Sequence, residues 1–507
     1  MLISDYRRDF SQYCTAFETA HFRYRAGFDK ELHLEEIYDR CGDLFTAQAI
    51  ESLRIAYEET PPQFETERLG VRLLTGSARA GFLEARARGL TAEVARYEAA
   101  AVVEWDGERF PLNDVPRIIS NEPLASRRRD LGARLVDARS RCNDSRIARL
   151  ESLHESARAL DFDSYLALFS EITGTDFTSL AASAARFLES TESAYSSTLA
   201  RTVARDLPDV AFDELQLVDF LYFQRILPLD PFFPSHDLML TYATAMAGFG
   251  IRIERQPNIH IDAESRASKN PRAACFRIAP PDDVRLLIAP VGGVHDYTTL
   301  FHQAGHAQHY GWSSRELCRR YPEFVYATDH ATSEGYAFLF SHLFQDVGWL
   351  MEHRKVATSA EAREIVRRLA LLSWCSIRRR CASLEYEIEL HDDGPIQAEE
   401  LAVAHSDAVS RATRFKRSPA LFLTEVDDGF YSAAYLRAWG FEVALREHLR
   451  TRYGRRWWAS RKAGDELIDL WNTSSRYTVE ELASLMGFGE ISFDLLAESL
   501  IAATKED

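Results

Sequence analysis

Two histidines four residues apart, His302 and His306 in the stretch FHQAGHAQHYG, are the residues whose type and spacing most directly predict chemistry. On an α-helix, residues four apart lie on one face, so both imidazoles can point at a common metal ion. The spacing is that of the H-E-x-x-H motif of zinc enzymes, but Gln303 stands where those enzymes carry a glutamate. The stretch therefore predicts a metal site, and whether that site hydrolyses anything is a separate question.

A third ligand must come from another element, because a catalytic zinc ion generally takes three protein ligands and leaves one position for water. His309 lies about 10 Å along the helix axis from His302, which is too far for both side chains to reach one tetrahedral ion. The segment that follows predicts an amphipathic helix, with Thr332 or Ser333 as its cap and Glu334 in its first turn. Glu334 is the candidate third ligand, although a carboxylate there is also favoured by the helix dipole alone.

Most of the remaining chain has the apolar spacing of amphipathic helices. The segments that show it are residues 83–103, 124–160 with a break near Cys142, 178–205, 213–226, 236–249, 359–390 and 397–414. The sequence therefore predicts a mainly α-helical protein.

Residues 257–294 depart from this pattern, because apolar residues there alternate or run in short pieces. Residues 274–278 and 284–288 predict a two-stranded hairpin with prolines in its turn. Gly292 and Gly293 end the second strand, and Asp296 is expected to cap the histidine helix, which would run to about Tyr310. The hairpin thus delivers the chain directly into the candidate metal site.

Composition and charge exclude several classes of protein. The chain has 507 residues, of which 46% are hydrophobic and 27% charged, as in an ordinary globular protein. Its net charge of -17 disfavours binding to nucleic acid or anionic lipid. We find no apolar run of signal-peptide or membrane-span type, and the seven cysteines are scattered and never form a C-x-x-C pair. We therefore expect a cytoplasmic protein with reduced thiols and no membrane partner.

The order of these parts resembles the thimet oligopeptidase and oligoendopeptidase F family of zinc metallopeptidases. The family motif H-E-F-G-H-x-x-H is matched by His302, Gly305, His306 and His309, with Gln303 in the position of the general base. Glu334 corresponds to the family's third zinc ligand. Residues 153–169 and 427–443 also resemble family segments, and in the second of these Tyr435, with Tyr431 as second choice, corresponds to tyrosines that stabilise the substrate oxyanion.

This resemblance implies a multi-helix, two-lobed zincin fold with a deep channel and one small β element. It implies an N-terminal helical region over 1–250, a zinc-site core over 251–351 and a C-terminal helical region over 352–507 that closes the channel. One zinc ion would be bound, and the partner would be an oligopeptide or another small-molecule substrate. Either hairpin strand could pair with an extended peptide through backbone hydrogen bonds.

Gln303 leaves the reaction open, because an amide can hydrogen-bond a water molecule but cannot accept its proton. Hydrolysis would then be reduced or lost while the metal ligands stay intact. Either the glutamine was introduced to trap a substrate, or the protein is a zinc-bound pseudoenzyme, or it runs a different zinc-assisted reaction. The neighbouring candidates for a proton acceptor in that last case are His295, His309, Asp329 and His330.

Other hypotheses concern the surroundings of the site. Asp329 could orient a metal-bound histidine. Arg272, Arg437 and Arg476 could each bind a peptide carboxylate or form structural ion pairs. A different class of hypothesis has no metal, with His302 and His306 buried in a helix contact of a binding module.

Overall fold

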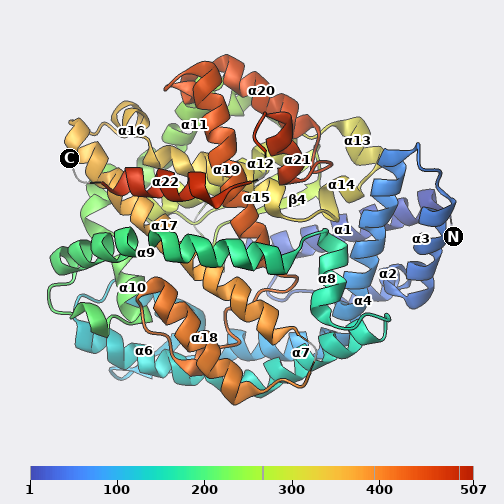
Figure 1. Ribbon diagram of the computed structural model, residues 1–507, viewed down its shortest axis with the longest axis horizontal. Helices are drawn as coiled ribbons and strands as arrows, with labels where there is room; N and C mark the ends of the chain where they lie inside the picture. Colours follow the sequence, from blue (N-terminus) through green and yellow to red (C-terminus); the bar gives the residue numbers. More distant parts are fainter. Residues whose placement is uncertain (1, 265, 267, 393, 490, 506–507) are drawn as a thin grey trace. The chain divides into compact units, whose positions relative to one another are not determined.

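The computed structural model describes residues 2–264, 266, 268–392, 394–489 and 491–505, and over these residues the chain is mainly α-helical, as the sequence predicts (Figure 1). It forms two compact units that each draw on three stretches of chain. Unit 1 comprises Met1–Phe82, Pro228–Val366 and Arg437–Leu496, and unit 2 comprises Leu83–Leu227, Arg367–Leu436 and Ala497–Asp507. Four helices belong partly to each unit: α4 (Glu65–Ala100), α17 (Ser359–Leu390), α19 (Tyr431–Tyr453) and α22 (Phe493–Thr504).

Unit 1 contains the candidate metal site and a small sheet. Its other α-helices are α1 (Ile3–Arg25), α2 (Glu35–Cys41), α3 (Ala47–Glu59), α11 (Leu238–Gly248), α12 (Val294–Trp312), α13 (Arg315–Arg320), α14 (Glu323–Tyr326), α15 (Ala331–His342), α16 (Val347–His353), α20 (Arg461–Asn472) and α21 (Val479–Leu485). Its strands are β3 (Ile259–Asp262), β4 (Ala274–Ala279) and β5 (Asp283–Leu287).

Unit 2 is helical apart from one short hairpin. Its other α-helices are α5 (Val115–Ile119), α6 (Ala125–Ser140), α7 (Asn143–Arg158), α8 (Tyr165–Thr173), α9 (Phe177–Asp206), α10 (Leu217–Phe223) and α18 (Ala398–Thr413). Strands β1 (Val102–Trp105) and β2 (Glu108–Pro111) pair antiparallel across a turn at Asp106 and Gly107. The prediction of a single β element is therefore wrong, because the turn after α4 closes a second hairpin.

The predicted hairpin of unit 1 is confirmed, but it belongs to a three-stranded sheet. The strand order is β3-β5-β4, with β5 antiparallel to β4 and parallel to β3. Alternate residues of β4, Phe276 among them, are buried against Phe22 of α1 and against Ala26, which follows that helix. Because β5 is the central strand, residues 284–288 offer no free edge, and the expectation that they could pair with a peptide is wrong.

Helix α12 begins directly after a glycine turn. Gly292 and Gly293 have φ angles of 105° and 94°, a backbone conformation that favours glycine. Gly293 is the N-cap, so the prediction that Asp296 caps the helix is wrong. The Asp296 carboxylate instead accepts hydrogen bonds from the backbone N–H groups of Val291 and Gly292, both at 2.6 Å, and stabilises the turn that feeds the helix.

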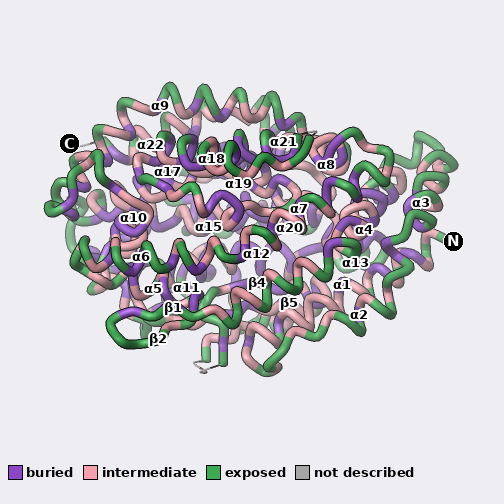
Figure 2. Tube along the Cα trace, turned by 90° about the horizontal axis from the view of Figure 1, so that it is seen from below, coloured by how far each residue is buried: buried purple, intermediate pink, exposed green. Residues whose placement is uncertain are grey.

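The contact between α12 and α15 is the closest helix packing at the site. A Cβ atom added to Gly305 would lie 2.5 Å from the Cα atom of Ala337 and 2.8 Å from the carbonyl oxygen of Tyr336, so only glycine allows this approach. Buried residues run along both helices (Figure 2). The two helices therefore share one densely packed interface in the core of unit 1.

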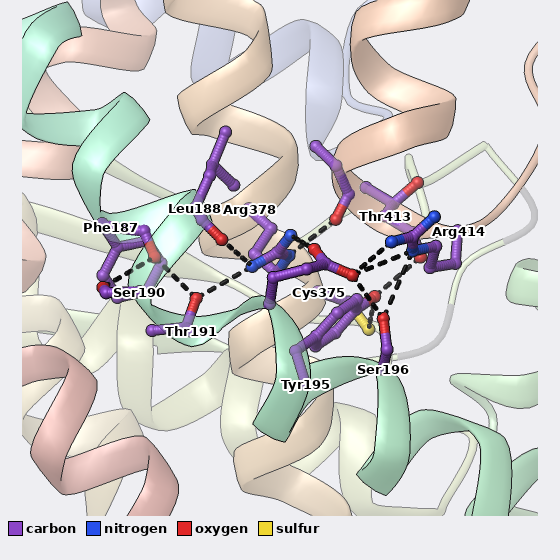
Figure 3. A network of polar contacts seen from close by, with 12 residues as sticks. Phe187, Leu188, Ser190, Thr191, Tyr195, Ser196, Cys375, Arg378, Thr413 and Arg414 are labelled. Atoms are coloured by element: carbon purple, nitrogen blue, oxygen red, sulfur yellow. Dashed lines mark hydrogen bonds and ion pairs between the residues drawn. The ribbon is translucent and has the colours of Figure 1, made fainter.

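The core of unit 2 is tied together by an arginine network (Figure 3). Arg378 of α17 is 1% exposed and donates to the carbonyl oxygens of Ala412 and Leu188 and to the Thr191 hydroxyl. Tyr195 donates to the carbonyl oxygen of Thr413 at 2.7 Å. These bonds satisfy polar groups of α9, α17 and α18, and they fix the three helices against one another.

Unit 2 also buries a pair of histidines. The Nε2 atom of His154 lies 2.9 Å from the Nδ1 atom of His391, and the ring of Tyr165 stacks on His391 at 4.3 Å. Burial lowers the pKa of His154 to about 4, and burial also holds the pKa of His391 well below its ordinary value. Both imidazoles are therefore neutral at neutral pH.

Over the described residues, no helix is long and apolar enough to cross a membrane. The seven cysteines are free thiols.

We expect the Gly305→Ala variant to lower the free energy of unfolding by about 1–3 kcal/mol, because the new methyl group overlaps the backbone of α15. Urea denaturation measures this change. The matched control is Gly89→Ala in α4, where an added Cβ meets nothing within 4 Å. That substitution should be neutral or stabilising by up to about 1 kcal/mol, since it only removes backbone freedom. Equal effects of the two substitutions would contradict the packing argument.

The histidine pair predicts that unit 2 loses stability in acid. The unfolded chain takes up protons on these imidazoles near pH 6.5, whereas folded His154 does so only near pH 4. Stability is therefore complete above the unfolded pKa and falls as pH drops through this window, by about 1.4 kcal/mol per pH unit for each proton. Denaturant titrations at several pH values measure the slope. In the His154→Gln variant the slope of unfolding free energy against pH should be shallower by one proton. An unchanged slope would contradict the conclusion that folded His154 stays neutral in this pH range.

Candidate metal centre

The structure brings His302, His306 and Glu334 together, although the glutamate lies 28 positions after the second histidine in the sequence. The histidines lie on successive turns of α12, and the glutamate lies in the first turn of α15, across the contact at Gly305. One potential ligand atom from each residue lies within 4.8 Å of the other two. The helix contact therefore sets the spacing of the three donors.

The distances fit a small cation. The Nε2 atoms of His302 and His306 lie 3.3 and 3.7 Å from the Oε2 atom of Glu334. A tetrahedral zinc ion bound at about 2.0–2.1 Å holds its ligand atoms about 3.3 Å apart. The three donors thus need only small adjustments to surround an ion of that size.

The protonation of His306 also suits a ligand. Burial lowers the pKa of His306 to about 3, and the nearby Glu334 carboxylate opposes this only in part. The imidazole is therefore neutral at physiological pH, which is the form that binds metal ions. Among the described residues, its buried Nδ1 atom has no hydrogen-bond partner, while its Nε2 atom faces the carboxylate. Nε2 is accordingly the candidate ligand atom.

Aromatic rings hold the two imidazoles in place. The ring of Tyr310 lies parallel to that of His306 with centroids 6.3 Å apart, and the ring of Phe338 lies 5.4 Å from that of His302. The side chain of His302 is 20% exposed, against 4% for Glu334. The site is therefore buried on the side of the carboxylate and reachable by solvent at His302.

Gln303 projects from α12 beside the two histidines. Successive residues of an α-helix are about 100° apart, so Gln303 lies about 60° around the axis from His306. Its side chain is partly exposed. The amide can donate to or accept from a molecule bound beside the histidines, but it offers no titratable group at neutral pH.

The start of α15 differs from the sequence prediction. The helix begins at Ala331, so Thr332 and Ser333 lie within its first turn and neither is its cap. The carboxylate of Asp329 accepts the backbone N–H of Ala331 at 2.5 Å and takes over the capping role. Glu334 still falls in the first turn, as predicted.

Asp329 does not orient a histidine as the sequence hypothesis allowed. Its second carboxylate oxygen pairs with the guanidinium of Arg437. Arg437 in turn makes two hydrogen bonds of 2.7 Å to Glu480, so its donors serve structural ion pairs. Of the other two arginines considered as carboxylate binders, Arg476 donates to the Thr66 hydroxyl and Arg272 is exposed.

His309 belongs to the protein core. It is fully buried, and its ring packs against those of Tyr310 and Tyr336 at 5.1 and 5.0 Å. Its side chain is not among the three whose donor atoms converge. This placement agrees with its exclusion on axial distance.

The two candidate oxyanion tyrosines lie in unit 2, at the start of α19. Their rings pack edge to face with centroids 4.8 Å apart, and the guanidinium of Arg380 lies 4.6 Å from the ring of Tyr435. Tyr431 and Tyr435 are thus one turn apart on a single helix face, and both are partly exposed.

The sequence interpretation missed the supporting residues. Phe338 follows Glu334 by one helical turn, so helical spacing could have placed its ring on the same face of α15. The partner of that ring could not be found in the same way, because Trp439 stacks on Phe338 at 4.6 Å from a distant part of the chain. Pairing across such a separation is visible only in the folded structure.

The whole fold matches solved peptidase structures. Metallocarboxypeptidase 1 of Trypanosoma cruzi superposes on this chain with a TM-score of 0.65, covering 99% of each chain at 13% sequence identity. PZ peptidase A, in a complex with inhibitor 2, gives a TM-score of 0.64, covering 98% of this chain and 90% of its own at 16% identity. At these identities the similarity concerns the fold.

No family model and no curated protein matches the sequence. The resemblance to the thimet oligopeptidase and oligoendopeptidase F family therefore stays a prediction. What the structural matches establish is that this chain shares the mainly α-helical fold of these two solved structures.

Proposed function

We propose that this protein binds one zinc ion through His302, His306 and Glu334. The observation that carries the proposal is the convergence of two imidazole nitrogens and one carboxylate oxygen across the α12–α15 contact. Two histidines and a carboxylate are a common ligand set of catalytic zinc, which keeps a further position for water or substrate. The partial exposure of His302 leaves room for that position.

The substrate class that fits best is a short peptide, since the fold is shared with two solved structures that are named as peptidases. Zinc bound at such a site acts as a Lewis acid toward a carbonyl group and lowers the pKa of water. Tyr435, with Tyr431 as the second choice, is proposed to stabilise the oxyanion of the substrate with a hydrogen bond from its phenol group. The edge strand β4 is proposed to pair with the extended peptide.

Gln303 separates binding from turnover. A glutamate at this position would accept a proton from water and pass it to the leaving amine, whereas the amide can only hold the water by a hydrogen bond. General base catalysis contributes roughly 10²–10⁴-fold, so we propose that peptide hydrolysis is reduced or lost by this factor.

A second candidate function follows from the same residue. With the ligands intact and the base absent, the protein would act as a zinc-bound pseudoenzyme, or as a zinc enzyme of different chemistry that binds a peptide or small-molecule ligand. The presence of a glutamine at position 303, where a general base would be needed, is the observation that favours this second function.

Zinc content tests the metal site directly. We expect the purified protein to contain about one zinc ion per chain by elemental analysis, because three donors are already in place. His302→Ala should lose most of this zinc. The matched control is His295→Ala, which removes an exposed histidine from the first turn of the same helix and should keep the metal. Absence of zinc from the wild-type protein after growth with zinc would overturn the proposal.

The Gln303→Glu variant tests the catalytic machinery. We expect it to cleave a quenched fluorogenic oligopeptide roughly 10²–10⁴-fold faster than the protein with Gln303, since a proton acceptor is restored. The double variant with His302→Ala should lose this gain. If Gln303→Glu binds zinc in full but cleaves no faster, peptide hydrolysis is excluded and the second candidate function holds.

A further inference from the structure

We infer that Arg437 positions the metal ligand Glu334, acting through Asp329 and the start of α15; this inference rests on the proposed zinc site. Glu334 is 3% exposed and lies in the first turn of the helix. Its place therefore depends on where α15 begins and how firmly that first turn is held. The N-cap residue, His330, provides no side-chain hydrogen bond to the first turn.

Asp329 supplies the missing cap. One oxygen of its carboxylate accepts the N–H of Ala331, the first residue of α15, at 2.5 Å. A carboxylate at this end of a helix is favoured both by the open N–H groups and by the helix dipole. A side chain with one such contact could still turn away, since the net contribution of a single hydrogen bond is small.

Arg437 prevents that movement. Its Nη1 atom pairs with the other oxygen of Asp329, while its Nε and Nη2 atoms each donate at 2.7 Å to the two oxygens of Glu480 in α21. The Arg437 side chain is 9% exposed, and the two-pronged contact with Glu480 fixes the plane of the guanidinium. The capping carboxylate is thus held by a charged group that cannot easily reorient.

The same stretch of α19 holds α15 from a second side. A Cβ atom added to Gly335, the residue after Glu334, would lie 2.4 Å from the ring of Phe441. Two residues after Arg437, the ring of Trp439 stacks on Phe338 with an interplanar angle of 7°, and Phe338 contacts the ring of His302. Residues 437–441 of α19 therefore support both the glutamate ligand and one histidine ligand, although none of them touches the metal position.

The test compares metal affinity, the visible absorption spectrum of the cobalt-substituted protein, and thermal stability in the full chain. In Arg437→Met we expect zinc affinity, measured by competition with a chromogenic chelator, to fall about tenfold or more, because residues that orient ligands typically contribute this much. The cobalt bands, which report the geometry around the ion, should shift. Arg437→Lys keeps the charge but not the two-pronged contact, and its affinity should lie between those of the wild type and the methionine variant.

A matched control separates positioning from general destabilisation. Arg128→Met removes a buried arginine of unit 2 that pairs with Asp219 at 2.9 Å, and it should lower thermal stability while leaving zinc affinity and the cobalt spectrum unchanged. Should Arg437→Met not fold, Asp329→Asn provides the same comparison, since an amide keeps the shape but weakens both contacts. Zinc affinity and a cobalt spectrum equal to those of the wild type in these variants would overturn the inference. Absence of zinc from the wild type would instead overturn the proposed function.

Discussion

The close contact between α12 and α15 is the constraint on which the rest of the site depends. Two histidines on one helix can supply only two donors, and the third must reach them from a neighbouring backbone. Gly305 allows the backbones to approach until an added Cβ would lie 2.5 Å from Ala337. At that separation the Glu334 carboxylate comes within 3.3–3.7 Å of both imidazole nitrogens. A residue larger than glycine at position 305 would push the two helices apart and move the Glu334 carboxylate away from the histidines.

The residues around this contact hold the candidate ligands in place more than they offer reactive groups. His306 is buried and neutral, Tyr310 and Phe338 pack against the ligand rings, and Asp329 is held by Arg437 where α15 begins. A histidine binds a metal ion in its neutral form, so two imidazoles and one carboxylate would bring a single negative charge to a divalent ion. The charge of the ion would then offset the electrostatic cost of burying the carboxylate. These features explain how ligands can be held ready for a metal ion.

Gln303 has little influence on this arrangement, because an amide and a carboxylate of the same length have nearly the same shape. The residue changes only whether a side chain beside the two histidines can accept a proton. The geometry of the candidate ligands and the ability to accept a proton therefore depend on different residues of the same helix turn. A chain of this fold can keep the ligand geometry while it loses the proton acceptor.

The sequence by itself determined most local features. The 32-residue α17 and the 30-residue α9 follow from apolar spacing within a residue or two, and the hairpin of β4 and β5 follows from short apolar runs around a proline turn. The spacing of His302 and His306 predicted their common helix face, and family resemblance pointed to Glu334. Caps were predicted less well, because Asp296 and Asp329 bond to backbone groups whose positions depend on where each helix starts.

Only the tertiary structure decided what joins these features. The third strand β3 lies beside β5 in parallel, and parallel pairing across a long connection leaves no local signal. The stretches that make each unit are likewise separated by long segments of chain. The contacts around the candidate ligands also come from far along the chain, since Arg437, Glu480 and Trp439 lie more than 100 positions after the start of α15. Side-chain type and spacing are properties of a single segment, whereas the approach of two backbones to within a few ångströms depends on how the whole core packs.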